Sequence, residues 1–296
     1  MSKVGFIGVG TMGCPMATNI VNKGNELSFY DPYVQADNKD KLLNLGGKYC
    51  TSIKELLDDM DFVITMLPNG NNVKEVSLGE DGLLKQFYKD YIYIDMSTIL
   101  PADSISINKE FESQNIKMFD APVARLVNNA IDGTLLILVG GDKNIFDKIK
   151  PLLETMGSDV VYCGENGSGS KMKIINNYMS IVSNIVTAET LTLVEKSGID
   201  LDLAIKLLTS TAAGKGHLNV SYPMKVLKND VSAGFKNTLA LKDLRLALQQ
   251  GSIDGINLNT GKSALKSYEE ADETNYKDLD WTSMFNFIKE KNKLSK

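Results

Sequence analysis

Apolar and polar residues follow two different periods in the first half of the chain. Short runs of β-branched and aromatic residues indicate strands, and the segments between them repeat apolar residues every three or four positions, which indicates helices. The predicted strands are residues 3–7, 27–30, 62–66, 91–95, 117–119, 135–139 and 160–162, and the predicted helices are residues 16–23, 39–45, 53–57, 105–113 and 145–153. Alternating strands and helices predict a mostly parallel sheet with helices on both faces.

The pattern changes at a glycine-rich stretch, residues 164–169. After it, strand-like runs become scarce, and a long helical period covers residues 170–196. Shorter helical segments follow at residues 203–210, 222–228, 239–250, 262–271 and 281–293. We therefore predict an α/β fold, with a doubly wound, mostly parallel sheet in a first domain of residues 1–163 and an all-α second domain of residues 164–296.

A glycine motif follows the first predicted strand directly. Gly8, Gly10 and Gly13 stand between that strand and the first helix, and Asp31 ends the second strand. This context is typical of a dinucleotide-binding βαβ unit, in which the three glycines allow a tight turn, a close approach of the pyrophosphate, and close packing of the helix on the strand. The helix N-terminus then binds the phosphates. The alternative is a glycine-rich turn that binds no ligand.

Asp31 bears on the choice of dinucleotide. A carboxylate at this position accepts hydrogen bonds from the ribose hydroxyls of NAD and repels the 2′-phosphate of NADP. No arginine follows it in Asp31-Pro32-Tyr33, so the sequence favours NAD. The alternative is an aspartate that only begins the turn before Pro32.

Two loops follow predicted strands of the same sheet. Leu67 and Pro68 come after the strand at 62–66, and Ser97 and Thr98 come after the strand at 91–95. Open α/β sheets bind ligands at the carboxyl ends of their strands, so Ser97 and Thr98 are candidates to bind the nicotinamide, its ribose or the substrate. The alternative is an ordinary loop that caps the helix after it.

Arg125 lies in a nearly uncharged segment just past a predicted strand. A guanidinium group in that position can bind a carboxylate or a sulfonate through paired hydrogen bonds. The alternative is a surface arginine without a ligand.

Lys173 and Asn177 lie four residues apart on the long predicted helix, and Asn176 and Ser180 form a second pair at this spacing. Residues four apart share one face of a helix. A lysine beside amide and hydroxyl groups is a candidate proton donor, because hydride delivery to an aldehyde builds alkoxide charge that an ammonium group can neutralise. The alternative is a solvated helix lysine.

The composition excludes several classes of function. A net charge of −5 provides no basic surplus for binding nucleic acid. The three cysteines are widely spaced and histidine occurs once, so we expect free thiols, a reducing compartment and no metal site. No apolar run approaches the length of a membrane span or a signal segment, so we expect a cytoplasmic protein without a membrane partner.

These residues, in this order, resemble the β-hydroxyacid dehydrogenase family. The likeness extends from residues 5–8 to residues 280–281 and includes the stretches at 64–70, 94–99, 120–125, 175–180, 211–217 and 242–244. The resemblance implies a Rossmann domain, a helical second domain, an active site in the cleft between them, and a homodimer or homotetramer. It also implies that Lys173 is the acid/base residue and that Asn177 holds substrate. The cofactor NAD is implied to contact Thr11, Met12, Asp31, Leu67, Thr98 and Lys242.

The segment around Arg125 resembles one branch of this family. Members typically carry Ser-Gly-Gly where this chain has Ala124, Arg125 and Leu126. Members that reduce 3-sulfolactaldehyde place an arginine at the middle position, which implies that Arg125 binds a sulfonate together with the stretch from Asn176 to Ser180. The small polar residues that follow the arginine in those enzymes are replaced here by Leu126 and Val127.

The expected function is therefore the NADH-dependent reduction of 3-sulfolactaldehyde to 2,3-dihydroxypropane-1-sulfonate, a small anionic substrate, with Lys173 as the general acid. One alternative is a 3-hydroxyisobutyrate, tartronate-semialdehyde or 4-hydroxybutyrate type of dehydrogenase with a carboxylate substrate. Another is a dinucleotide-binding module without catalysis, which would be expected to lack the lysine at position 173.

Overall fold

The computed structural model describes residues 1–86, 91–196, 198–210, 216–217, 219–253, 255 and 258–294. The chain divides into two compact units, Met1–Ile174 and Ile175–Lys296. The domain boundary predicted at residue 164 precedes this division and stays a prediction.

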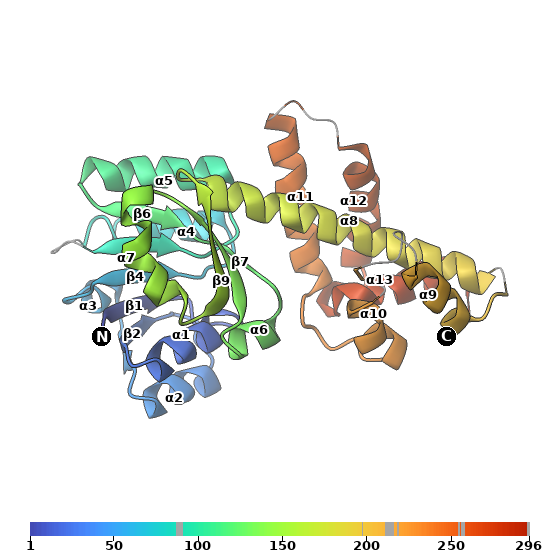
Figure 1. The fold of residues 1–296 in the computed structure, drawn as a ribbon, viewed down its shortest axis with the longest axis horizontal. Coiled ribbons are helices and arrows are strands. Elements are labelled where there is room, and N and C mark those ends of the chain that lie inside the picture. Colours follow the sequence, from blue (N-terminus) through green and yellow to red (C-terminus); the bar gives the residue numbers. More distant parts are fainter. Residues whose placement is uncertain are drawn as a thin grey trace. The chain divides into compact units, whose positions relative to one another are not determined.

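The first unit is built on one nine-stranded sheet (Figure 1). Its strands are β1 (Lys3–Ile7), β2 (Glu26–Tyr30), β3 (Lys48–Tyr49), β4 (Phe62–Thr65), β5 (Ile92–Asp95), β6 (Lys117–Asp120), β7 (Val123–Ala124), β8 (Leu135–Gly140) and β9 (Gly157–Gly164). They follow the order β3-β2-β1-β4-β5-β6-β8-β7, and β9 pairs with β8. All pairs are parallel except β6 with β8 and β7 with β8. The predicted mostly parallel, doubly wound sheet is confirmed.

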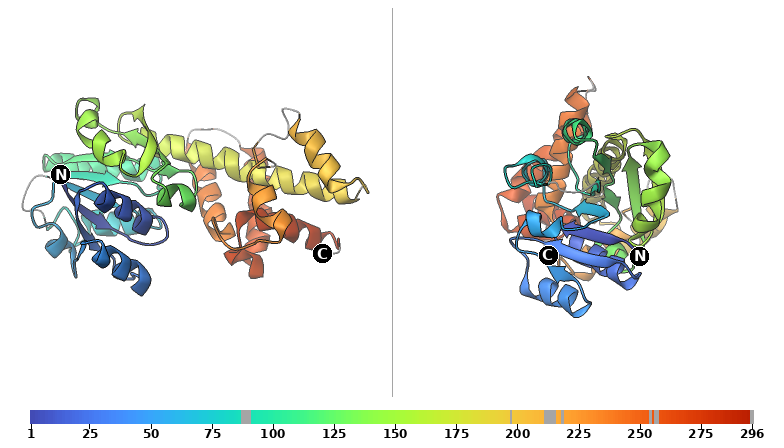
Figure 2. Two further views of the ribbon diagram at one scale, coloured as in Figure 1. Left: turned by 60° about the horizontal axis from the view of Figure 1, so that its bottom comes forward. Right: turned by 90° about the vertical axis from the view of Figure 1, so that its left-hand side faces the viewer.

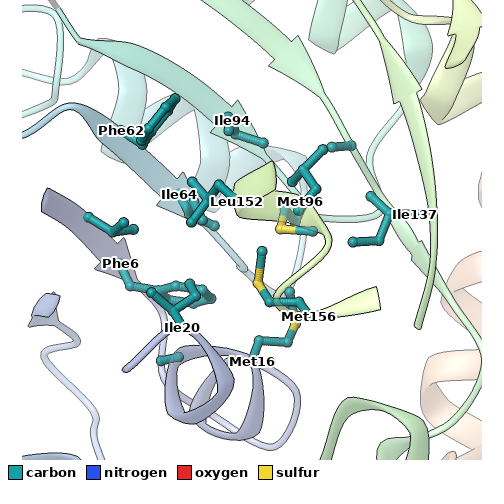
Figure 3. Packing of buried hydrophobic residues seen from close by; sticks show 14 of the residues in the cluster. Phe6, Met16, Ile20, Phe62, Ile64, Ile94, Met96, Ile137, Leu152 and Met156 are labelled. Atoms are coloured by element: carbon teal, nitrogen blue, oxygen red, sulfur yellow. The ribbon is translucent and has the colours of Figure 1, made fainter. Parts of the chain in front are cut away.

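Helices cover both faces of this sheet, as the views in Figures 1 and 2 show. They are α1 (Gly13–Asn22), α2 (Ala36–Asn44), α3 (Ile53–Leu56), α4 (Gly70–Leu78), α5 (Pro101–Ser113), α6 (Val127–Ile131) and α7 (Lys143–Leu153). Alternate residues of each strand enter opposite cores. Ile64 of β4 packs with α1 and α7 (Figure 3), whereas its neighbour Val63 packs with α3, α4 and α5.

The strands that the sequence analysis missed are the shortest ones. Strands β3 and β7 have two residues each, too few for an alternation to be visible. Helix α4 was also missed; only Val73 and Ser77 of its nine residues are buried, so few of its positions read as apolar. Helix α6 follows the segment around Arg125 and has five residues, fewer than two turns.

The second unit is helical, as predicted. It holds most of α8 (Ser168–Lys196) together with α9 (Leu201–Thr209), α10 (Ser221–Met224), α11 (Asn237–Ile253), α12 (Asn259–Asp272) and α13 (Met284–Lys291), and short 3₁₀ helices at Val226–Lys228, Asn275–Asp278 and Trp281–Ser283. Its core includes Ile185, Leu244, Tyr268 and Phe285. The helix predicted at 222–228 is interrupted at Lys225, and the one predicted at 281–293 begins as a 3₁₀ helix. None of the helices in the described ranges is long and apolar enough to cross a membrane.

Candidate active site

The glycine loop lies between β1 and α1 and has the geometry that each predicted role requires. Gly8 has a φ of +92°, and a Cβ at this position would lie 2.4 Å from the carbonyl oxygen of Met66. A Cβ on Gly13 would lie 1.9 Å from the carbonyl oxygen of Gly8, so helix and strand are in close contact there. Gly10 is exposed, and a Cβ there would meet no atom within 4 Å. The loop is therefore closed against the sheet and open at Gly10, which fits a pyrophosphate.

Helix α1 presents its N-terminus to this loop. Its first turn contains no acidic residue, so no side chain there neutralises the positive end of the helix dipole. Thr11 is exposed and Met12 is half-buried. The loop therefore provides what a dinucleotide phosphate needs: backbone N–H groups, a favourable dipole and space.

Asp31 directly follows β2 and is tied to the glycine loop by a hydrogen bond. Its Oδ2 accepts a hydrogen bond from the Val9 N–H at 3.0 Å, and its Oδ1 accepts one from the Tyr33 N–H at 2.8 Å. These bonds fix the carboxylate beside Gly8 and Gly10. That placement is the one from which an acidic residue binds ribose hydroxyls.

The loops after β4 and β5 meet at the same edge of the sheet. The Leu67 N–H donates a hydrogen bond of 2.9 Å to Oγ of Ser97, so these two predicted residues lie together. Ser97 is buried and Thr98 is half-buried, while Pro68 is exposed. Because β2, β1, β4 and β5 are parallel neighbours, their carboxyl ends place the glycine loop, Asp31, Leu67 and Ser97 along one edge.

A buried polar network contacts the backbone of Ser97. Asp95 accepts hydrogen bonds through Oδ1 from the Thr65 hydroxyl at 2.7 Å and from the Ser97 N–H at 3.2 Å. The hydroxyls of Thr65 and Tyr93 are 2.9 Å apart. Burial raises the pKa of the Asp95 carboxyl and raises the pKa of Tyr93 well above its ordinary value. The sequence analysis did not identify this network, because Thr65 and Tyr93 lie within apolar strand runs and Asp95 is a single acid at a strand end.

Lys173 is half-buried and lies in the second turn of α8, after the glycine-rich segment that begins this helix. The start of α8 is fixed to the sheet by Asp120, the last residue of β6. Its Oδ1 accepts a hydrogen bond from the Gly167 N–H at 2.6 Å, and its Oδ2 accepts one from the Ser170 N–H at 2.7 Å. Burial raises the pKa of Asp120 to about 7, although the two N–H groups favour its ionised form.

Arg125 follows β7 and has a φ of +81°. Its guanidinium donates hydrogen bonds of 2.7 Å to the carbonyl oxygen of Thr134, 2.8 Å to the hydroxyl of Ser158 and 2.7 Å to the carboxylate of Asp159. The hydrogen bond from Ser158 and the contact with Arg125 lower the pKa of Asp159. The structure thus groups Arg125 with the first residues of β9, a contact that the sequence analysis did not anticipate.

In the second unit, two predicted residues meet at an acid that was not predicted. The Asn177 amide donates a hydrogen bond to Asp243, and the Lys242 amine lies 2.9 Å from the carboxylate of Asp243. Asp243 and Asn177 are both buried. Asn176 is exposed, and its amide donates a hydrogen bond of 3.3 Å to Oδ1 of Asn177. Sixty-six residues separate Asn177 from Asp243, so no local pattern could reveal this contact.

Ser180 is half-buried, and its carbonyl oxygen lies 2.6 Å from Nε2 of His217, the single histidine. Burial lowers the pKa of His217. Of the loop at 211–217, residues 211–215 lie outside the described residues. Within the described part of the chain, no group of three or more His, Cys, Asp or Glu side chains is arranged to hold a metal ion.

A doubly wound sheet with an open glycine loop, an acid at the end of β2 and polar loops at the neighbouring strand ends defines a class: a dehydrogenase that uses a nicotinamide dinucleotide. The sequence matches two family models. Residues 3–164 match the NAD-binding domain of 6-phosphogluconate dehydrogenase, and residues 167–288 match the NAD-binding domain of NADP-dependent 3-hydroxyisobutyrate dehydrogenase.

Known proteins are similar to this chain over almost its whole length. It is 37% identical to 3-sulfolactaldehyde reductase of Escherichia coli K12, over 98% of this chain and 96% of the relative, and 36% identical to mitochondrial 3-hydroxyisobutyrate dehydrogenase of Mus musculus, over 97% and 87%. The solved structure of Mycobacterium tuberculosis 3-hydroxyisobutyrate dehydrogenase with L-serine superposes with a TM-score of 0.89 at 29% identity, covering 97% of this chain and 99% of that one. The chain therefore belongs to the 3-hydroxyisobutyrate dehydrogenase family of β-hydroxyacid dehydrogenases. It is an NAD-binding oxidoreductase that acts on a CH–OH group.

The position of Asp31 leads to a prediction about cofactor choice. We expect Asp31→Ser to lower kcat/KM with NADH and to raise it with NADPH, since in its predicted role Asp31 accepts hydrogen bonds from the ribose hydroxyls and repels a 2′-phosphate. Losing one charge-assisted hydrogen bond costs about 1.5–3 kcal/mol, so the NADH:NADPH preference should fall at least about ten-fold. Steady-state kinetics with both cofactors measures this ratio. Asp40→Ser, which removes an exposed carboxylate from α2, is the control. An unchanged ratio in Asp31→Ser would remove Asp31 from the ribose site.

Proposed function

We propose that the chain reduces 3-sulfolactaldehyde to 2,3-dihydroxypropane-1-sulfonate with NADH, that Arg125 binds the sulfonate, and that Lys173 donates the proton. The observation that carries the sulfonate assignment is the backbone at Arg125. Members of this family typically have glycine at this position. The φ of +81° at Arg125 is in the left-handed region that glycine prefers.

An arginine in the left-handed region is strained. The left-handed conformation costs a residue with a side chain about 1–2 kcal/mol relative to the right-handed one. Such strain persists where the side chain has a task that glycine cannot perform. A guanidinium provides five N–H donors in a planar fork, which suits a tetrahedral anion.

A sulfonate remains ionised at every relevant pH, so its binding site needs charge-assisted donors to offset desolvation. In the structure, Arg125 already binds an anion, the carboxylate of Asp159, together with the hydroxyl of Ser158. This contact supports the proposal that the guanidinium can bind an anion. The side chain of Arg125 is also 39% exposed, which supports its being accessible to a substrate. In the proposed complex, the sulfonate shares or takes over these donors.

A bound dinucleotide would supply a hydride to the aldehyde carbon, and the residues of this chain would position the substrate and protonate its oxygen. The glycine loop and α1 would hold the pyrophosphate, Asp31 the adenosine ribose, and the loops with Leu67, Pro68, Ser97 and Thr98 the nicotinamide end and the reacting part of the substrate. Lys173 would donate a proton from Nζ to the oxygen that gains charge. Asn177, held by Asp243, would present its amide to the substrate hydroxyl, and Lys242 would contact the cofactor.

A carboxylate substrate is the alternative, and two observations favour keeping it. Identities of 37% to the sulfolactaldehyde reductase and 36% to the mouse 3-hydroxyisobutyrate dehydrogenase differ by too little to decide a substrate. Leu126 and Val127 also stand where small polar residues follow the arginine in the sulfolactaldehyde pattern. Neither apolar side chain can donate a hydrogen bond to a sulfonate.

A substrate panel tests the proposal. NADH consumption by the purified protein is measured with 3-sulfolactaldehyde and with tartronate semialdehyde at equal concentrations. We expect kcat/KM to be at least about ten-fold higher for the sulfonated aldehyde, because one good charge-assisted contact is sufficient for that ratio. A preference for tartronate semialdehyde would support the carboxylate alternative, and turnover of neither aldehyde would contradict the sulfonate proposal and the tartronate-semialdehyde form of the alternative.

A further inference from the structure

Helix α8 begins with a glycine as its N-cap residue. It starts at Ser168, and the Lys171 N–H donates a hydrogen bond of 2.9 Å to the carbonyl oxygen of Gly167, which makes Gly167 the N-cap residue. Glycine has no side chain with which to accept hydrogen bonds from the first turn of a helix. Any side-chain cap of α8 at this residue therefore comes from another part of the chain.

Asp120 provides that cap from the end of β6. Its two carboxylate oxygens accept the N–H groups of Gly167, at the N-cap, and of Ser170, in the third helical position. In an ordinary capping box these two N–H groups bind two different side chains of the helix itself. Here one carboxylate, 47 and 50 residues away in the sequence, binds both. The first turn of α8 is thus fixed to the sheet at two points.

Close packing restricts the same turn further. A Cβ on Gly169 would lie 2.2 Å from the carbonyl oxygen of Leu138 and 2.8 Å from that of Asp120. The backbone of α8 at this point therefore rests directly on β6 and β8. Asp120 is fully buried at the contact.

Asp120 is a costly way to cap a helix. Burial raises the pKa of its carboxyl to about 7, so ionising it inside the protein is less favourable than in water. A serine, threonine or asparagine could satisfy one of the two N–H groups without a buried charge. Only a carboxylate accepts from both with two equivalent oxygens, which indicates that the direction of the helix start is important.

We propose that Asp120 is a positioning residue, which fixes the first turn of α8 and thereby the direction in which Lys173 presents its amine. Lys173 comes three residues after Ser170, so a rotation or shift of the first turn moves the Lys173 side chain with it. The inference rests on the proposed role of Lys173 as proton donor. It adds a residue that touches neither substrate nor cofactor.

The test replaces Asp120 by asparagine, which has nearly the same shape but can accept only one of the two N–H groups. We expect kcat of Asp120→Asn to fall at least about ten-fold, since small displacements of a catalytic group have effects of this size or larger. The dissociation constant for NADH, measured by fluorescence titration, should stay within about two-fold, because the glycine loop is untouched. A cap with only a stabilising role would leave kcat of the folded variant unchanged.

Asp142→Ala is the control, because alanine removes the capping oxygen whereas asparagine would keep it. Asp142 caps α7 by accepting the Asn144 N–H at 3.0 Å, and α7 carries none of the predicted site residues. The kcat of this control variant should stay within about two-fold of that of the parent protein. A ten-fold loss in this control would show that any lost cap lowers turnover, and would overturn the proposal.

Hydrogen exchange tests the cap without any substitution. In the unaltered protein, the amides of Gly167 and Ser170 should exchange much more slowly than exposed amides, and exchange as fast as in an unfolded chain would overturn the proposal even if Asp120→Asn did not fold. Comparison with Lys173→Ala separates this inference from the proposed function. If Lys173→Ala lowers turnover and a folded Asp120→Asn does not, only the inference is wrong. If Lys173→Ala keeps turnover, the proposed role of Lys173 is wrong.

Discussion

Lys173→Ala is expected to lower kcat by about 10²–10⁴-fold, the usual contribution of a positioned general acid. The proton that Nζ would donate in the proposed reaction must then come from water. NADH binding should change little, because the glycine loop and Asp31 are intact. Measuring kcat from NADH consumption and the dissociation constant from fluorescence titration separates the two effects.

Lys171→Ala is the matched control for this substitution. Lys171 is exposed and lies two residues before Lys173 on the same helix, so it faces a different direction. The Lys171→Ala substitution removes the same charge and the same side chain from α8. Near-normal kcat in Lys173→Ala, or an equal loss in both variants, would contradict the assignment of Lys173 as proton donor.

Arg125→Gly is expected to raise KM for the sulfonated aldehyde by roughly 10–100-fold, because a charge-assisted contact of about 1.5–3 kcal/mol is lost. The free energy of unfolding should change little. The partly exposed ion pair with Asp159 is screened by solvent and contributes little, and glycine relieves the strain of the positive φ. Loss of substrate binding without loss of stability would identify the guanidinium as a ligand for the anion.

Two comparisons make the Arg125 result specific. Arg125→Ala should raise KM equally but be less stable than Arg125→Gly by about 0.4–1 kcal/mol or more, since alanine keeps the strained backbone. Arg245→Ala removes the only other arginine, which forms an exposed ion pair of 2.9 Å with Glu269, and should leave KM unchanged. If KM of Arg125→Gly equals that of the parent protein, Arg125 does not bind the substrate.

The sequence was sufficient to predict the fold, for a physical reason. Strands such as β4 and β5 are buried on both faces and read as continuous apolar runs, and Gly8, Gly10 and Gly13 mark a turn whose geometry fits a phosphate. These signals are local. Two-residue strands and the weakly apolar α4 carry no comparable signal.

The supports of the predicted side chains could not be read from the sequence. Asp120 binds residues 47 and 50 positions away, Asn177 binds Asp243, and Arg125 binds Asp159. Each pair is brought together only by the packing of the sheet and helices, and an isolated aspartate in a sequence does not indicate its partner. The left-handed backbone at Arg125 was also hidden, because arginine is an uncommon residue for that conformation.

The ion pair between Arg125 and Asp159 has a consequence for which aldehydes can react. On the proposed function, the anionic group of the substrate replaces the Asp159 carboxylate at the guanidinium. A substrate must therefore bind Arg125 more favourably than Asp159 does. An uncharged aldehyde cannot replace the Asp159 carboxylate at the guanidinium, so it would gain no binding energy from Arg125 and should have a higher KM than an anionic aldehyde. The proposed site would in this way favour anionic aldehydes over neutral ones.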